Sequence, residues 1–159
     1  MRIGIGFDVH RFDPSRPLIL GGVTIPGSPG LAGHSDADVV CHALADAILG
    51  AASLGDLGEH FPPGAVEWKD ISSLVILQRA GEMAREPGHR VASVDAVVLI
   101  EAPMLAPFRD EMRKNIARAL DIEADSVGLK ATTTEGLGAI GRGEGAACMA
   151  VALLEPLHE

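Results

Sequence analysis

The sequence predicts a single α+β domain, residues 1–159, in which helices pack on one face of a mixed β-sheet as two layers. Runs with alternating or β-branched apolar residues, which are typical of strands, take turns along the chain with runs whose apolar residues recur every three or four positions, as in helices. A Gly-Gly pair between two short apolar runs indicates an antiparallel hairpin. The sequence contains no internal repeat and no linker, and its length suits one domain.

The first half of the chain predicts a strand, a hairpin and a helix. Ile3, Ile5 and Phe7 alternate with small or polar residues, as in a half-buried strand. Ser35 suits a helix N-cap, because its hydroxyl can accept a hydrogen bond from a free amide of the first turn. In chain order we expect a strand over 1–10, a polar loop over 11–17, a hairpin over 18–25, a loop over 26–33, a helix from 35 to about 52 and a loop over 55–64.

The second half predicts two helices and three strands. Leu74, Val75, Leu77 and Met83 are expected to face inward from the first of these helices. Residues 146–154 are rich in alanine, and we favour a strand there over a helix. In chain order we expect a helix from Ser72 or Ser73 to Pro87, a strand over 90–101, a tight connection between Pro103 and Pro107, a helix from Pro107 with Phe108, Met112, Ile116 and Leu120 on one stripe, and strands over 126–131 and 146–154.

Composition restricts the partners of the chain. Its net charge of −9 argues against nucleic acid and anionic membranes, because no basic surface is left to displace counterions. We find no signal peptide and no apolar run of membrane-spanning length, so we expect a cytoplasmic protein with Cys41 and Cys148 as buried thiols. Hydrophobic residues make up 47% of the chain, and burying them is easier where a neighbouring subunit covers the second face of the sheet.

A candidate zinc site comes from the first strand and the first helix. Asp8 and His10 are two residues apart in the strand and so project from the same face. Together with His42 they supply two imidazoles and one carboxylate, a donor set typical of catalytic zinc. Asp38 and Asp46 lie four residues on either side of His42 in the expected helix, where we expect them to orient its ring.

A second candidate site lies in the glycine-rich segment 130–145. Consecutive threonines at a strand end offer hydroxyls and amides, Glu135 offers an oxygen ligand for magnesium, and Arg142 offers a fork that matches phosphate. The combination suits a diphosphate. Glycines 136, 138 and 141 match a dinucleotide-binding fingerprint, but too little chain follows them for the helix, strand and acidic residue that complete that motif.

The motifs of this sequence resemble those of a known family, the 2-C-methyl-D-erythritol 2,4-cyclodiphosphate synthases of the non-mevalonate isoprenoid pathway. The resemblance covers essentially the whole chain, and its motifs occur in the right order and spacing. They are Gly-Phe-Asp-Val-His at 6–10, His-Ser-Asp-Ala-Asp at 34–38, His42, Asp46, Leu-Gly-Ala at 49–51, Gly-Asp-Leu-Gly at 55–58, His-Phe-Pro at 60–62, Lys-Ala-Thr-Thr-Thr-Glu at 130–135 and Gly-Arg-Gly-Glu-Gly at 141–145.

The resemblance implies a phosphorus–oxygen lyase that acts as a homotrimer, with active sites at the subunit boundaries. Zinc binds Asp8, His10 and His42, and a second ion, magnesium or manganese, binds Glu135. The implied substrate is a cytidine diphosphate ester of methylerythritol 2-phosphate. Its 2-phosphate attacks the β-phosphorus, CMP leaves, and a cyclic diphosphate forms.

The resemblance also implies roles for individual residues. His34 and Thr133 align the phosphates, Asp56 and Gly58 contact the methylerythritol, and the loop 103–106 with Thr132 receives the cytidine phosphates. Arg142 with Phe7 resembles a pocket on the trimer axis that can hold an isoprenoid diphosphate. The implied substrate-binding set is Asp8, Val9, His10, His34, Ser35, Asp56, Leu57, Gly58, Phe61, Pro103, Met104, Leu105, Ala106, Thr132, Thr133, Thr134, Glu135 and Arg142.

Four positions depart from the family pattern: Pro63, Met104, Gly136 and Ala139. These departures predict the same reaction with an altered nucleotide affinity.

Two other functions are compatible with the same candidate residues. Two imidazoles and a carboxylate also describe a mononuclear iron oxygenase, although the order of the motif is reversed and its double-stranded barrel needs more strands. The glycine-rich segment is also compatible with a non-catalytic trimer that binds a small ligand.

Overall fold

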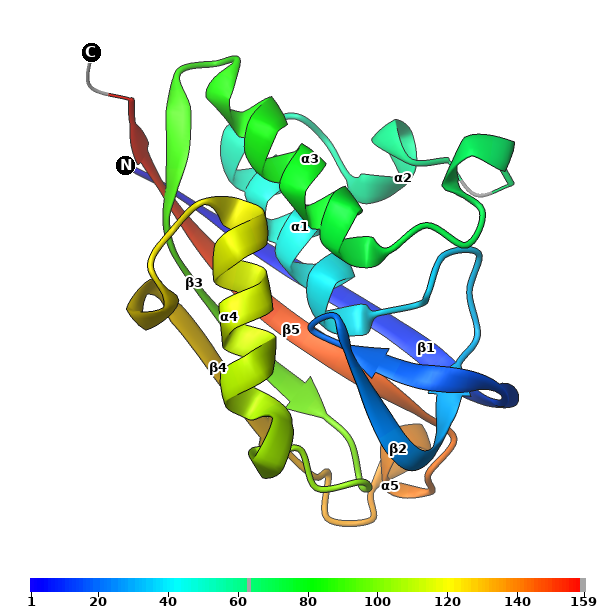
Figure 1. The fold of residues 1–159 in the computed structure, drawn as a ribbon. Helices are drawn as coiled ribbons and strands as arrows, with labels where there is room; N and C mark the ends of the chain where they lie inside the picture. Colours follow the sequence, from blue (N-terminus) through cyan, green and yellow to red (C-terminus); the bar gives the residue numbers. More distant parts are fainter. Residues whose placement is uncertain (63, 158–159) are drawn as a thin grey trace.

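The computed structural model describes residues 1–62 and 64–157, so Pro63 lies outside the described residues. It contains one five-stranded sheet with the order β2-β1-β5-β3-β4, in which only the β3–β4 pair is parallel. Helices α1, α3 and α4 cover one face of this sheet (Figure 1). The predicted mixed sheet with helices on one face is confirmed.

The elements follow in this order. The strands are β1 Arg2–Leu20, β2 Val23–Leu31, β3 His89–Leu99, β4 Val127–Thr132 and β5 Gly145–Pro156. The helices are α1 Val39–Ala52, α2 Leu57–His60, α3 Ser73–Arg85, α4 Arg109–Leu120 and α5 Gly138–Gly141, with 3-10 turns η1 Val66–Trp68, η2 Ala106–Phe108 and η3 Ala124–Ser126. Segment 146–154 is thus a strand, as predicted.

The hairpin is confirmed, but its strands are longer than predicted. Gly21 and Gly22 form the turn with φ angles of 54° and 71°, which a primed hairpin turn requires. The segments 11–17 and 26–33, which were expected to be loops, are largely strand. The reason is that β1 and β2 continue to pair with each other through these residues. The prolines of these segments are tolerated because the pairing register is irregular there.

Helix α1 begins later than predicted, and its N-cap is Asp38 rather than Ser35. Ala37 has a left-handed backbone (φ 57°), so the residues before Asp38 are not helical. Asp38 Oδ1 accepts hydrogen bonds from the amides of Val40 (3.0 Å) and Cys41 (3.2 Å), and Oδ2 accepts one from the amide of Gly22 (2.8 Å). This buried carboxylate therefore joins the hairpin turn to the start of the helix.

Two glycines bring β1 and α1 into close contact. A Cβ atom on Gly4 would lie 1.9 Å from the carbonyl oxygen of Ala47, and one on Gly6 would lie 1.9 Å from that of Ala43. Any side chain at these positions would push the helix off the strand. The Gly-x-Gly pair thus has a packing role, and helix α1 lies between the sheet and α3 at the centre of the fold (Figure 1).

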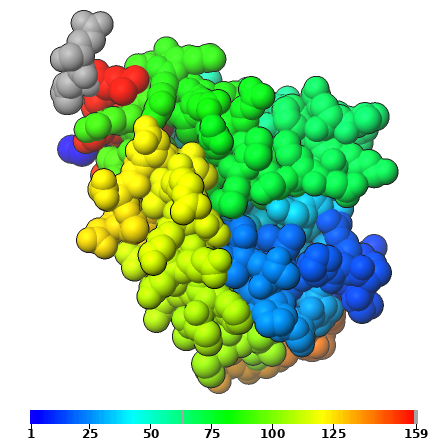
Figure 2. Space-filling view, in the orientation of Figure 1, coloured from blue at the N-terminus to red at the C-terminus, as the bar shows by residue number. Residues whose placement is uncertain are grey.

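The other two long helices close the same face. Figure 2 shows α3, α4 and the hairpin on the surface of this side of the molecule. The predicted stripe of α4 is largely confirmed, with Met112, Ile116 and Leu120 buried. The prediction for α3 is wrong in part, because Val75 is exposed and Ile76 is buried in its place. The helix turns a different set of positions inward because its close neighbours are α1 and α4.

The opposite face of the sheet carries exposed apolar side chains. Ile3 and Ile5 of β1 are 74% and 68% exposed, and Phe7, Val9, Met149 and Val151 continue the patch over β1 and β5. This patch is the second apolar face that the composition predicts. In the described part of the chain, no helix has both the length and the apolar character that a membrane crossing needs.

Candidate active site

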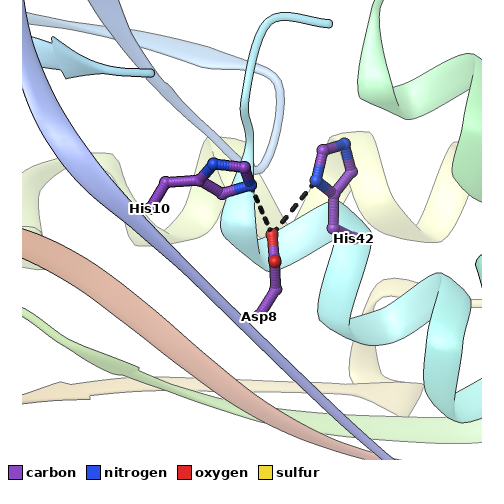
Figure 3. A group of neighbouring side chains, drawn as sticks. All are labelled: Asp8, His10 and His42. Carbon is purple, nitrogen blue, oxygen red and sulfur yellow. Dashed lines mark hydrogen bonds and ion pairs between the residues drawn. The ribbon is translucent and has the colours of Figure 1, made fainter. Parts of the chain in front are cut away.

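Three predicted metal ligands come together at the contact between β1 and α1. Asp8 and His10 project from the same face of β1, and His42 lies in the first turn of α1. Asp8 Oδ2 lies 3.0 Å from His10 Nε2 and 3.1 Å from His42 Nδ1 (Figure 3). One donor atom from each residue lies within 4.8 Å of the other two. This is the predicted pair of imidazoles with one carboxylate.

The outer nitrogens of both imidazoles are engaged by the protein. His10 Nδ1 donates to the carbonyl oxygen of Ala32, so Nε2 is the nitrogen that can bind a metal when the ring is neutral. His42 Nε2 lies 2.9 Å from Ser73 Oγ and 3.1 Å from Ser35 Oγ. Ser73 Oγ donates to Asp36, so its oxygen accepts from His42 Nε2, and Nδ1 is the nitrogen that faces Asp8. The donor set therefore fits a divalent cation.

Asp38 and Asp46 do not orient the ring of His42, contrary to the prediction. Asp38 is the helix cap, and Asp46 Oδ1 accepts a hydrogen bond from the amide of Leu57 at 3.1 Å. The prediction failed because α1 begins at Val39, which leaves Asp38 outside the helix. Asp36 and Ser73 take this role instead. Ser73 is far along the chain from His42, and no local spacing pointed to it.

Asp8 and His10 shift each other's pKa in opposite directions. Burial raises the pKa of Asp8, but the hydrogen bonds from His10 and His42 outweigh that effect and hold this pKa well below its ordinary value. The hydrogen bond to Asp8 raises the pKa of His10, against the opposing effect of burial. The carboxylate is therefore ionised at neutral pH and ready to bind a cation.

A hollow of about 570 Å³ opens beside the three ligands. Its lining also includes His34, Ser35, Leu57, Gly58 and Phe61. Asp56 caps helix α2 and lines an adjoining hollow of about 330 Å³, which also touches Asp8 and His42. Asp56 and Gly58, the two residues predicted to contact the methylerythritol, thus lie beside the metal ligands.

A separate cleft of about 520 Å³ lies over β4 and the connection after β3. Its lining contains the residues predicted to receive the cytidine phosphates, namely Pro103, Met104, Leu105, Ala106 and Thr132, and also Thr133, which is predicted to align the phosphates. None of the three hollows described above contains both these residues and the metal ligands. The residues predicted to bind the substrate therefore line separate hollows in this chain.

The chain is similar to known proteins over nearly its whole length. A family model described as the YgbB family matches residues 1–155. The chain belongs to the YgbB family. A relative named 2-C-methyl-D-erythritol 2,4-cyclodiphosphate synthase, from Chlorobium phaeovibrioides, is 58% identical over 98% of this chain and 99% of its own length.

Solved structures agree with the YgbB assignment. The bifunctional IspDF of Campylobacter jejuni has a TM-score of 0.94 and 44% identity over 98% of this chain, which spans 42% of that longer protein. IspF of Plasmodium falciparum, described as a CDP complex, has a TM-score of 0.85 and 32% identity over 99% of this chain and 97% of its own. Over residues 1–62 and 64–157 the strands form a single five-stranded sheet and not the double-stranded barrel that the iron oxygenase hypothesis requires.

The remaining predicted residues line none of these three hollows. Val9 is exposed on the opposite face of β1 from the metal ligands. Thr134 bonds to Glu101, and the exposed Glu135 has a left-handed backbone (φ 53°). Arg142 pairs with Glu144 at 2.6 Å. None of them joins the metal-ligand group in the described part of this YgbB chain.

Sequence reasoning missed Trp68 and Lys69, which line the hollow beside the metal ligands. Trp68 packs edge-on against Phe61, with ring centroids 5.0 Å apart. Trp68 is the single tryptophan of the chain, and a lone aromatic residue in the glycine- and proline-rich region before α3 was the available signal.

Proposed function

We infer that this chain converts 4-diphosphocytidyl-2-C-methyl-D-erythritol 2-phosphate to 2-C-methyl-D-erythritol 2,4-cyclodiphosphate and CMP. The observation that carries the inference is the convergence of Asp8, His10 and His42 beside two adjoining hollows lined by Asp56 and Gly58, the residues predicted to contact the sugar. The YgbB match and the name of the Chlorobium relative support it.

The reaction needs alignment and charge stabilisation more than a strong base. An oxygen of the 2-phosphate forms a bond to the β-phosphorus, the bond from this phosphorus to its bridging oxygen breaks, and CMP leaves with that oxygen. A phosphate monoester is already anionic at neutral pH, so the main task is to bring two repelling anions into line. In the proposal, His34 at the hollow and Thr133 at the cleft hold the phosphates for attack.

We propose two metal ions. Asp8, His10 and His42 would hold zinc, and Glu135 would hold magnesium or manganese. Bound there, they would supply Lewis-acid stabilisation of charge on the phosphoryl oxygens. The observation that supports the zinc site is the convergence of His10 Nε2 and His42 Nδ1 on the ionised carboxylate of Asp8.

The active unit is proposed to be a homotrimer that joins the two halves of the site across subunit boundaries. The exposed patch of Ile3, Ile5 and Phe7 supports an assembly, because an apolar face of this kind is costly to leave in water. The hollow beside the metal ligands is separate from the cleft over β4, which supports a site that two subunits share. Arg142 and Phe7 are further proposed to line a pocket for an isoprenoid diphosphate on the trimer axis.

The first experiment measures CMP release from the cytidylyl substrate in the presence of magnesium. The wild type is expected to release CMP, whereas His42→Ala and Asp8→Ala stay folded and lose the activity together with bound zinc. His89→Ala, at the start of β3, is a histidine control and is expected to keep both. A folded, zinc-loaded wild type that releases no CMP would contradict the function.

A second experiment tests the shared site by subunit mixing. His42→Ala damages the hollow, and Thr133→Val damages the cleft. Each variant alone is expected to be inactive, and mixed trimers are expected to regain part of the activity, because some sites combine two intact halves. Mixed trimers that form without any activity would show that each subunit works alone.

The rival hypothesis of a non-catalytic ligand-binding trimer predicts that His42→Ala leaves ligand binding intact.

A third experiment separates the two metals. Glu135→Gln is expected to raise the magnesium concentration needed for activity and to leave the zinc content unchanged. Glu123→Gln, on an exposed turn, is the control. Loss of zinc from Glu135→Gln would place Glu135 in the other metal site.

A further inference from the structure

Arg16 lies where strand β1 departs from regular pairing. The register with β2 passes from Asp13 opposite Gly30 to Pro17 opposite Pro29, so residues 14–16 have no regular partner. Ser15 closes this bulge, because its amide and hydroxyl both donate to Asp13 Oδ1, at 2.9 and 2.6 Å. A bulge redirects a side chain out of the strand pattern, and here it directs the half-buried side chain of Arg16 toward the segment 33–35.

The guanidinium of Arg16 holds this segment at two points. One terminal nitrogen donates to the carbonyl oxygen of Gly33, and the other donates to that of Ser35. The carbonyl oxygen between them, that of His34, accepts a hydrogen bond from the amide of Asp70 at 3.0 Å. Three consecutive carbonyl oxygens are therefore fixed, two by one side chain and one by a backbone amide.

The segment that Arg16 holds carries two groups of the site. The side chain of His34 is exposed on the wall of the hollow. Ser35 is buried, and its hydroxyl lies 3.1 Å from the outer nitrogen of His42. A shift of this backbone would move both the phosphate-aligning histidine and a hydrogen-bond partner of a metal ligand.

We propose that Arg16 is a positioning residue, whose planar fork clamps the backbone of residues 33–35 and so places His34 in the hollow and Ser35 on His42. For its effect on turnover, this inference rests on the proposed function. Both terminal nitrogens are directed at carbonyl oxygens, so the role is different from direct binding of a substrate phosphate. A lysine cannot replace it, because one ammonium group does not reproduce the fixed spacing of the fork.

The test compares Arg16→Gln and Arg16→Lys with Arg11→Gln. Arg11 is exposed on the same strand and makes no side-chain hydrogen bond or ion pair within residues 1–62 and 64–157, so it controls for the lost charge. Arg16→Gln is expected to lower kcat by about tenfold to a hundredfold, the range that a small misplacement of an aligning group produces, with KM nearly unchanged. Arg16→Lys is expected to show a similar loss, and Arg11→Gln is expected to resemble the wild type.

Amide hydrogen exchange supplies a readout that does not depend on activity. Exchange over residues 32–38 is expected to rise in both Arg16 variants and to stay low in Arg11→Gln, with zinc content retained throughout. If Arg16→Gln does not fold, Arg16→Lys carries the test, because it keeps the charge and most of the aliphatic stem.

Two outcomes would overturn the proposal. Unchanged kcat and exchange in the Arg16 variants would show that the clamp is dispensable. A raised KM that Arg16→Lys restores would make Arg16 a contact for an anion of the substrate. If the wild type itself releases no CMP, the proposed function fails, and the exchange experiment still decides whether Arg16 holds the segment.

Discussion

The imidazole of His42 on helix α1 lies 3.1 Å from the carboxylate of Asp8 on strand β1, because the helix packs directly on the strand without intervening side chains. Gly6 is two residues before Asp8 and faces the same helix, where a Cβ atom would collide with the carbonyl oxygen of Ala43. The spacing of the metal ligands therefore depends on Gly6, which has no side chain and does not bind the metal.

Gly6→Ala is expected to destabilise the protein by about 3 kcal/mol, because the added methyl group must separate β1 from α1. The same movement draws His42 away from Asp8, so zinc affinity is expected to fall as well. Gly50→Ala is the control, since its Cβ atom would have nothing nearer than 4.0 Å and it lies on an exposed position of the same helix. That change is expected to stabilise the protein by about 0.5–1 kcal/mol. Denaturant unfolding and zinc titration measure both effects, and normal zinc affinity in a folded Gly6→Ala protein would contradict this explanation.

Ser73→Ala is expected to weaken zinc binding by about tenfold to a hundredfold, the usual effect of removing a hydrogen-bond partner from a ligating histidine. Without the hydroxyl, His42 Nε2 loses its acceptor at 2.9 Å, and the ring is less firmly held with Nδ1 toward Asp8. Ser72→Ala is the neighbouring control, because Ser72 is exposed and its side chain makes no capping hydrogen bond. Competition with a chelator measures the affinity. Equal affinities for the two variants would mean that Ser35 alone orients the ring.

The metal-free protein is expected to be stabilised by the pair of Asp8 and His10 mainly between about pH 4 and pH 6.5. The pKa of Asp8 is lowered on folding, so its contribution is present above the ordinary value of 3.8 and is lost as the pH falls through the folded pKa. The pKa of His10 is raised, so its contribution is full below 6.5 and is lost as the pH rises through the folded pKa. Urea unfolding of chelated wild type and Asp8→Asn across this range checks the prediction. A stability difference that is independent of pH would contradict it.

Zinc affinity is expected to rise as the pH rises through the pKa of His10, whereas the stability that His10 gives the metal-free protein falls. Zinc must displace the proton of His10, and the raised pKa of this residue means that the competition begins at a higher pH than for an ordinary histidine. The apparent affinity is therefore expected to fall by about tenfold per pH unit once His10 is protonated. Chelator competition between pH 5.5 and 8 measures this slope.

Trp68 is expected to report ligand binding by its fluorescence. It is the single tryptophan of the chain, and it lies on the wall of the hollow against Phe61. Adding the cyclodiphosphate product to the zinc-loaded protein is expected to change the emission spectrum, whereas His42→Ala is expected to show no change. An unaltered spectrum of the wild type at saturating product would place the sugar elsewhere.

Much of the architecture could be predicted from short-range patterns. Alternating residues along 1–10 predicted that Asp8 and His10 share a face, and the periodicity around His42 predicted the helix that carries the third ligand. The glycine pair at 21–22 predicted the hairpin turn, and the spacing of Met112, Ile116 and Leu120 predicted the buried side of α4. These features depend on residues within about ten positions of one another, where the strand and helix periods apply.

Tertiary structure decided the features that join distant segments. Asp38 caps α1 and also accepts a hydrogen bond from Gly22, and no local pattern distinguishes it from Ser35 as the cap. Ser73 reaches His42 only because α3 packs against α1, and Arg16 reaches Ser35 only because β1 bulges beside β2. The sequence by itself determined which side chains can bind a metal. The packing of β1, α1 and α3 decided which nitrogen of each histidine faces it, because hydrogen bonds across those contacts fix the rings.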